Sequence, residues 1–108
     1  MVGADGEHFS QIGGARLDMF NASVPYAELT VFRNAIRLNC LGQEYLFAKD
    51  TIAALAKYRG LFSIGLLIRH TVPLYPKFVV FWVSLFWSRT PFEKLKERLI
   101  AFGYEVRE

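Results

Sequence analysis

His70, Cys40 and His8 are the side chains of this chain whose types most often carry chemistry. A histidine serves as a general base only beside a group that orients it, and a metal site needs several ligands at a suitable spacing. The sequence places no such partner near His70, and neither Cys40 nor His8 stands at a ligand spacing from it. We therefore predict a structural histidine and a core cysteine, with no metal, no cofactor and no enzymatic activity.

Basic residues gather in the second half of the chain and are candidates for anion binding: Lys57, Arg59, Arg69, His70 and Lys77. If Arg59 and Arg69 lie close together on adjacent strands, the group can hold an anionic partner, and Tyr58 and Tyr75 can stack on nucleic-acid bases. Alternatively, these are solvated side chains that protect strand edges from unwanted pairing. We favour the second interpretation and do not expect a nucleic-acid partner.

Large apolar side chains near residue 85 are candidates for an interface: Trp82, Leu85, Phe86 and Trp87. Core packing is the default for Phe81 and Trp82. The three residues that follow Ser84 extend past the expected end of a strand, where one small core cannot hold them all. An exposed cluster of this size indicates contact with a protein or a membrane.

Two apolar runs, residues 60–68 and 78–87, resemble a membrane hairpin until their lengths are counted. Each is about half of the roughly 20 residues that a helix needs to cross a bilayer, so both are strand-sized. In the second run Phe78, Val80 and Trp82 alternate with apolar neighbours, which leaves neither face polar. We expect this strand to be covered on both sides.

Period-two alternation and turn residues predict the remaining strands. The predicted strands are residues 15–20, 26–32, 35–40, 45–48, 64–71 and 78–84. A loop at 21–25 separates the first two, and a tight turn at Arg33 and Asn34 precedes the third. Residues 52–58 fit either a strand or a short helix, and we favour a strand because its neighbours are strands.

The C-terminal helix carries the clearest local signals. Thr90, Pro91 and Glu93 have the arrangement of a capping box with proline in the first helical position. Apolar residues then recur at helical spacing, at Phe92, Leu95, Leu99 and Phe102. Gly103 is expected to end the helix, whose apolar face must cover the sheet.

At 108 residues the chain is expected to form one domain, residues 14–108, preceded by a flexible leader at residues 1–13 that is rich in glycine. The hydrophobic share of 53% and the aromatic share of 16% leave apolar surface for a partner. The net charge of +3 is mild. A single cysteine and the lack of a signal peptide favour the cytoplasm, with the inner membrane surface as an alternative location.

The residues also resemble a known family. The matching segments are residues 25–31, 36–38 and 45–50, followed by 65–70 and by Phe81 with Trp82. Over residues 15–106 they resemble small uncharacterised bacterial proteins with a pleckstrin-homology-like domain. The resemblance implies a mainly β split barrel of about seven antiparallel strands with one C-terminal amphipathic helix. Families with this fold bind phosphoinositides, phosphotyrosine or proline-rich peptides, or other proteins, so the resemblance implies binding rather than catalysis.

Lipid-binding members of that fold usually cluster Lys and Arg around the first hairpin loop. The expected loop here, residues 21–25, has no basic residue, so a specific phosphoinositide is not expected. The sequence therefore predicts a non-catalytic binding or scaffold module that contacts another protein or forms a homo-oligomer. The alternative is a peripheral module that attaches to anionic lipid through aromatic and basic residues.

Overall fold

The computed structural model describes residues 7–61, 63–85 and 89–108. The described residues form one sheet of eight strands and one α-helix. In chain order the elements are β1 (His8–Leu17), β2 (Phe20–Phe32), β3 (Ala35–Cys40), β4 (Gln43–Ala48), the 3-10 turn η1 (Lys49–Thr51), β5 (Ile52–Arg59), β6 (Ser63–His70), β7 (Val79–Leu85), α1 (Arg89–Ala101) and β8 (Val106–Arg107). The predicted mainly β class is confirmed.

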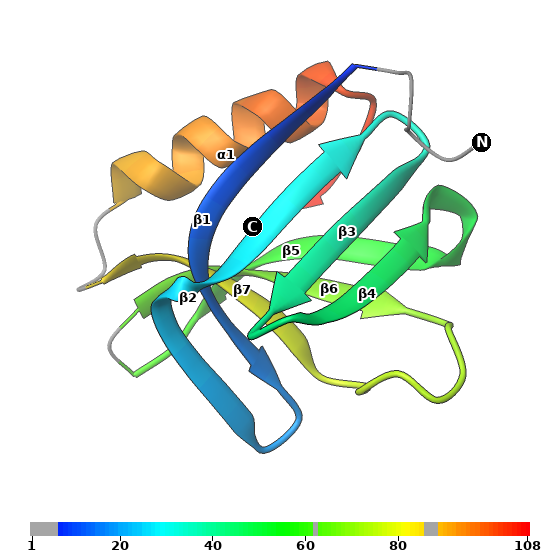
Figure 1. Cartoon of the computed structure of the whole chain (residues 1–108). Coiled ribbons are helices and arrows are strands. Elements are labelled where there is room, and N and C mark those ends of the chain that lie inside the picture. The colour runs from blue at the N-terminus through cyan, green and yellow to red at the C-terminus, as the bar shows by residue number, and fades with distance from the viewer. Residues whose placement is uncertain (1–6, 62, 86–88) are drawn as a thin grey trace.

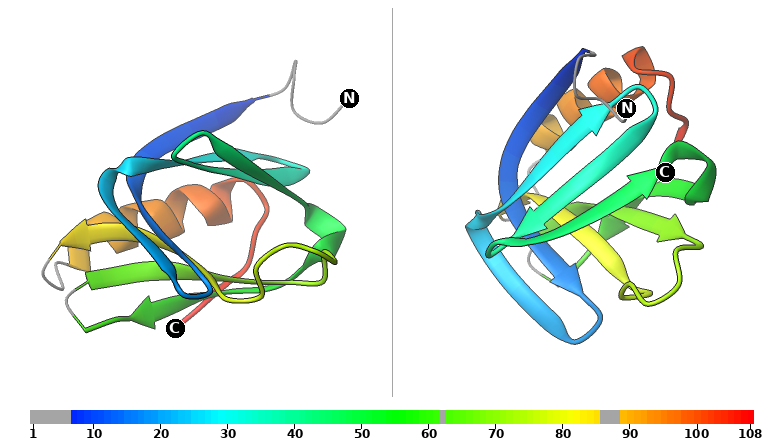
Figure 2. Two further views of the ribbon diagram at one scale, coloured as in Figure 1. Left: turned by 60° about the horizontal axis from the view of Figure 1, so that its bottom comes forward. Right: turned by 45° about the vertical axis from the view of Figure 1, so that its right-hand side comes forward.

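The sheet curls into an open half-barrel, and α1 lies in its concave side (Figures 1 and 2). The strand order is β4-β3-β2-β1-β7-β6-β5-β8, and every neighbouring pair is antiparallel except β5 and β8. Strand β1 pairs with β2 on one side and with β7 on the other, so it joins the two halves of the sheet.

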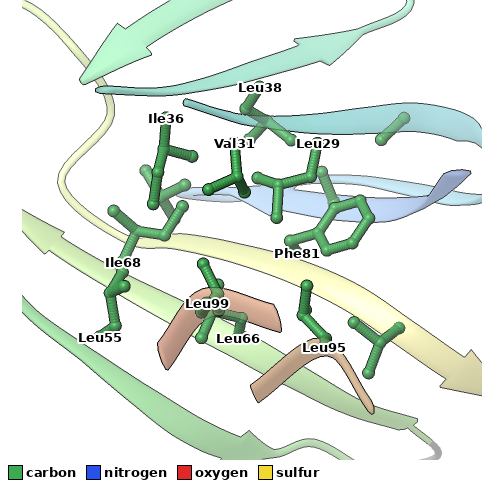
Figure 3. Close-up of a cluster of buried hydrophobic side chains, with 14 of the residues drawn as sticks. Leu29, Val31, Ile36, Leu38, Leu55, Leu66, Ile68, Phe81, Leu95 and Leu99 are labelled. Atoms are coloured by element: carbon green, nitrogen blue, oxygen red, sulfur yellow. The ribbon is translucent and has the colours of Figure 1, made fainter. Parts of the chain in front are cut away.

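The core fills the space between the concave face of the sheet and α1 (Figure 3). Leu95 and Leu99 of α1 are fully buried, as are Leu66 and Phe81 on the strands that face them. Cys40 is also buried in this cluster, as predicted, and burial raises the pKa of its thiol. A buried thiol of this kind is a packing group and not an activated nucleophile.

Most of the locally predicted elements are confirmed. The turn at Arg33 and Asn34 joins β2 to β3, and residues 52–58 belong to strand β5. In β7 the side chains of Val79, Phe81 and Val83 join the core, which leaves Val80 and Trp82 on the convex face. The helix begins at Arg89, so Thr90, the predicted cap, and Pro91, the predicted first helical residue, both lie inside it. Gly103 follows its end with a φ of 94°, the left-handed backbone that glycine favours.

The predicted flexible leader at residues 1–13 is wrong from His8 onward, because β1 begins there; residues 1–6 lie outside the described part of the chain. Phe9 pairs with Val31 of β2, and its ring packs edge to face on Phe102 with centroids 5.1 Å apart. Burial of this ring holds the segment in the sheet. Glycine here marks close approach between backbones and not a loose chain.

The loop predicted at residues 21–25 is also misplaced. The β1–β2 turn is Asp18 and Met19, since Leu17 pairs directly with Phe20. Asp18 adopts a φ of 55°, which aspartate tolerates, and its backbone and carboxylate both bond to the backbone of Phe78. Residues 21–25 lie within β2, where the register shifts opposite the segment 13–15.

The count of about seven strands is too low by the short strand β8. Val106 of β8 pairs with Leu55 of β5, and this pair of strands is parallel. Tyr104 anchors the chain before β8, because its buried hydroxyl donates a hydrogen bond of 2.6 Å to the carbonyl oxygen of Phe32. The anchor directs the chain end along the edge of β5.

Tyr104 gives the fold a predicted weakness at alkaline pH. Burial raises the pKa of its phenol from 10 to about 12, so the folded state favours the neutral form. This contribution to the free energy of unfolding is complete below pH 10 and is lost as the pH rises toward 12. We expect a loss of about 1.4 kcal/mol by pH 11 from this group.

Urea unfolding at pH 8 and pH 11 checks this expectation against Tyr104→Phe. The variant lacks the hydrogen bond to Phe32 and is expected to be less stable at pH 8 by about 1 kcal/mol. Its deficit should disappear by pH 11, because phenylalanine has no proton to lose. A deficit that stays constant between the two pH values would contradict the assignment.

No helix within the described ranges has the length and apolar composition required to cross a membrane.

Candidate functional site

A groove of about 430 Å³ opens on the convex face of the sheet, on the side away from α1. We call it the Trp82 groove. It is bounded by Arg16 and Met19 from the β1–β2 hairpin, Val24 from β2, Tyr58 and Leu61 from β5 and the turn after it, and Trp82 from β7. The tip of the β1–β2 hairpin projects beyond the rest of the sheet, which lets it form one wall (Figure 1).

The rings of Tyr58 and Trp82 form the floor of the groove. They come together because the residue between them, on the intervening strand β6, is a glycine. Gly65 of β6 pairs with Tyr58 on one side and with Trp82 on the other. Since glycine has no side chain, the two rings close over it with centroids 5.9 Å apart. A Cβ atom at position 65 would lie 2.6 Å from Cγ1 of Val80, 2.7 Å from the carbonyl oxygen of Phe81 and 2.9 Å from Cε3 of Trp82, too close for the present position of the indole and of the neighbouring strand. The absence of that Cβ therefore shapes the groove.

Hydrogen bonds fix the polar edges of the groove. The indole N–H of Trp82 donates to Oδ1 of Asn21 at 2.8 Å, so the ring is held in one orientation. The guanidinium of Arg16 lies over the ring of Phe78, with its carbon 4.9 Å from the ring centroid, and its Nε donates to the carbonyl of Asp18 at 3.0 Å. Both contacts hold Arg16 at the groove in a defined position.

The rim of the groove is apolar and exposed. Met19 is 90% exposed and Leu61 is 76% exposed, although both are large hydrophobic side chains. Single exposed hydrophobic residues are ordinary, but these two line the same groove as the rings of Tyr58 and Trp82, so the groove presents an apolar surface. This surface can receive an apolar side chain from a partner.

The predicted interface residues fall partly within this site. Trp82 lies on the convex face and lines the groove, so core packing, the default expected for it, is wrong, while Phe81 is fully buried as expected. Leu85 ends β7, and its side chain is outside the described set. Phe86 and Trp87 also lie outside the described residues.

The five candidate anion-binding residues do not form one site. Arg59 pairs with Ile64 and Arg69 pairs with Ala54, so the two arginines stand at opposite ends of the β5–β6 hairpin, about 16 Å apart along the strands. Lys57 extends toward the helix side, with Nζ 5.5 Å from the ring centroid of Phe92 and 3.9 Å from a carboxylate oxygen of Glu108. Lys77 is exposed just before β7. The register of the hairpin separates these charges.

His70 makes two hydrogen bonds that account for both of its ring nitrogens. Nδ1 accepts from the backbone N–H of Val72 at 3.1 Å, and Nε2 lies 2.7 Å from the carbonyl oxygen of Pro76. An accepting Nδ1 leaves the proton on Nε2, which then donates to Pro76. The ring also packs against Phe47, with centroids 4.8 Å apart. These contacts bear out the predicted structural histidine.

In the part of the chain that the structure describes, no three His, Cys, Asp or Glu side chains converge in a way that could hold a metal ion. The groove contributes aromatic rings, apolar side chains, one guanidinium and an amide. This set of groups can bind a ligand by burying apolar surface and by hydrogen bonding.

Sequence patterns pointed to only part of the groove. The alternation of β7 places Trp82 opposite Phe81, and an aromatic residue on each side of a paired glycine is a signal for Tyr58. Arg16, Met19 and Leu61 carry no such signal, because the fold alone brings them together. Comparison of the chain with models of known protein families, with curated proteins and with solved structures finds no match.

Proposed function

We propose that this protein is a non-catalytic binding or scaffold module that contacts another protein, or a second copy of itself, through the Trp82 groove. The observation that carries the proposal is an aromatic floor of Tyr58 and Trp82 beneath the exposed side chains of Met19 and Leu61. Aromatic residues that are already fixed in position lose little conformational entropy on binding, which is why they often serve as anchors at interfaces.

The proposal extends to the fold. Seven antiparallel strands followed by a helix that covers the concave face support a pleckstrin-homology-like half-barrel, the fold implied by the sequence resemblance. Such a scaffold holds a binding surface on rigid strands. The function assigned here rests on the groove, because a fold of this type hosts many different binding activities.

The test uses the capped peptide acetyl-Gly-Phe-Asn-Gly-amide as a neutral apolar probe, titrated into ¹⁵N-labelled protein. We expect saturable shifts of the Trp82 indole N–H resonance at millimolar peptide. The double variant Met19→Ser, Leu61→Ser should weaken binding about fivefold, since it removes the apolar rim. Both side chains are largely exposed, so the melting temperature should change little.

Leu74→Ser is the matched control for this test. Leu74 is fully exposed, as Leu61 nearly is, but it lies in the loop between β6 and β7 and does not line the groove. Its replacement should leave peptide binding unchanged. The peptide concentration of 10 mM is about tenfold above the dissociation constant expected for such a small ligand. An indole resonance that does not move at this concentration would refute the proposal.

Light scattering at tens of micromolar protein distinguishes the two kinds of partner. If a second copy occupies the groove, the protein is a dimer and the double variant is a monomer. If the wild-type protein is a monomer, the partner is a different protein.

A second candidate function is attachment to an anionic membrane, favoured by Met19 and Leu61 standing exposed at the same rim as Arg16. Apolar side chains would insert at the interface while the cation pairs with lipid headgroups. Sedimentation with anionic vesicles at low salt tests it. Unchanged sedimentation of the double variant relative to the wild type would exclude this role for the rim.

A further inference from the structure

We infer that the segment bound in the Trp82 groove is acidic as well as apolar, a stretch of partner protein in which a large apolar side chain stands next to a carboxylate. The apolar side chain packs on Tyr58 and Trp82, and the carboxylate pairs with the guanidinium of Arg16. The inference rests on the proposed function, because it names the chemistry of the partner that the same groove takes.

The geometry of Arg16 carries the first step. Its Nε is used by the carbonyl of Asp18, and its flat face is used by Phe78. Within the described ranges the two terminal amino groups of this guanidinium have no hydrogen-bond partner, and Arg16 has no ion pair. The side chain is therefore held in place while its strongest donors stay available. A planar carboxylate fits such donors well.

The neighbouring carboxylate does not compete for Arg16. Oδ1 of Asp18 accepts the backbone N–H of Phe78 at 2.9 Å, and the backbone N–H of Asp18 donates to the carbonyl of Phe78 at 2.8 Å. These bonds tie Asp18 to the start of β7. Because this oxygen of Asp18 bonds to the backbone and not to Arg16, the terminal amino groups of Arg16 can pair with a carboxylate from a partner.

The charge of the surrounding strands agrees with an acidic partner. Residues 51–92, which include β5, β6 and β7, contain no Asp or Glu, although of their five Lys or Arg residues Lys57 extends toward the helix side and Arg89 belongs to α1. Arg69 lies on the same convex face as Gly65, two alternations further along β6, and Lys77 precedes Phe78. An acidic segment is attracted to this face, and a basic one is repelled.

A protein segment fits the groove better than a nucleic acid does. Among the described residues Arg16 is the one Lys or Arg that lines the groove, whereas a nucleic-acid strand needs a track of cations along its backbone. The apolar rim formed by Met19 and Leu61 would also stand against the phosphates of such a strand. Apolar and acidic side chains in one peptide satisfy both parts of the surface.

Two capped peptides that differ only in charge test the inference: acetyl-Gly-Phe-Asp-Gly-amide and its Asn counterpart. Both are titrated into the ¹⁵N-labelled full chain at low salt, with the Trp82 indole and Arg16 Nε–H resonances followed. The Asp peptide should bind about fivefold more tightly than the Asn peptide. Arg16→Gln should abolish this preference, so that the variant binds the two peptides with equal affinity.

Arg69→Gln is the matched control, since it removes the same charge from the same face without touching the groove. It should preserve the preference for the Asp peptide. Equal affinity of the wild-type protein for the two peptides overturns the inference while the proposed function stands, and no binding of either peptide refutes the proposed function itself. Tighter binding of an eight-residue oligothymidylate at the same resonances also overturns the inference.

Discussion

Leu99→Ala is expected to lower the free energy of unfolding by about 3–4 kcal/mol. Leu99 is fully buried between α1 and the concave face of the sheet, close to Leu66 (Figure 3). Truncation removes its favourable transfer from water and leaves a cavity, because the curled sheet and the helix are both too rigid to close it. Urea denaturation followed by far-UV circular dichroism measures the loss.

Ile100→Ala is the matched control for this experiment. Ile100 is the next residue of the same helix, but it is 51% exposed. The same aliphatic truncation there should change the free energy of unfolding by less than about 0.5 kcal/mol, since alanine also has the higher helix propensity. Equal losses for the two variants would show that α1 does not seal the core of the half-barrel.

The residues expected to determine stability and those expected to bind a partner lie on opposite faces of the sheet. Leu99 acts on the concave face, whereas the Trp82 groove lies on the convex face. A Leu99→Ala protein that remains folded at low temperature should therefore bind the peptide probes as the wild type does. This outcome would localise binding to the convex face by a route independent of the groove variants.

Elements defined by local chemistry could be predicted from the sequence. The helix follows from its spaced apolar residues, although it begins before the predicted cap at Thr90, and the β2–β3 turn follows from Asn34. These signals act within a few residues of the chain. The same is true of β7, whose alternation puts Phe81 and Trp82 on opposite faces.

Elements defined by distant contacts could not be predicted in this way. The segment from His8 to Gly13 belongs to a leader that carries three glycines and no clear period, yet the segment pairs with β2 along its length. Asp18 turns the chain because Phe78, sixty positions away, satisfies its backbone and its carboxylate. A local sequence pattern does not indicate a contact with a residue so far away in the chain.

The candidate site shows the same division. Alternation puts Trp82 and Phe81 on opposite faces but does not say which points outward, because both faces are apolar. The groove around Trp82 depends on the register of β1, β5, β6 and β7 together. That register also holds Arg59 and Arg69 apart, so they do not form the anion site that was a candidate if they lay close together on adjacent strands. The number of charged side chains in a segment could thus be predicted from the sequence, but whether those side chains come together at one site could not.

Gly13→Ala is expected to lower the free energy of unfolding by about 3 kcal/mol, although it adds a single methyl group. A Cβ atom at Gly13 would lie 2.3 Å from the carbonyl oxygen of Trp82, and 2.7 Å from Cζ of Phe81. The first contact is with backbone at the junction of β1 and β7, where the two halves of the sheet meet. The strands must therefore move apart or β1 must lose its pairing there.

Gly42→Asn is the control, since a Cβ at Gly42 meets nothing within 4 Å and asparagine tolerates its φ of 84°. It should cost less than about 1 kcal/mol. The double variant Gly13→Ala, Phe81→Leu identifies the contact responsible for the loss at Gly13. Removing the ring should give little rescue, because the carbonyl of Trp82 remains in place. Full recovery relative to Phe81→Leu alone would assign the strain to the ring of Phe81, and the backbone of β7 could then no longer be the reason why β1 requires glycine.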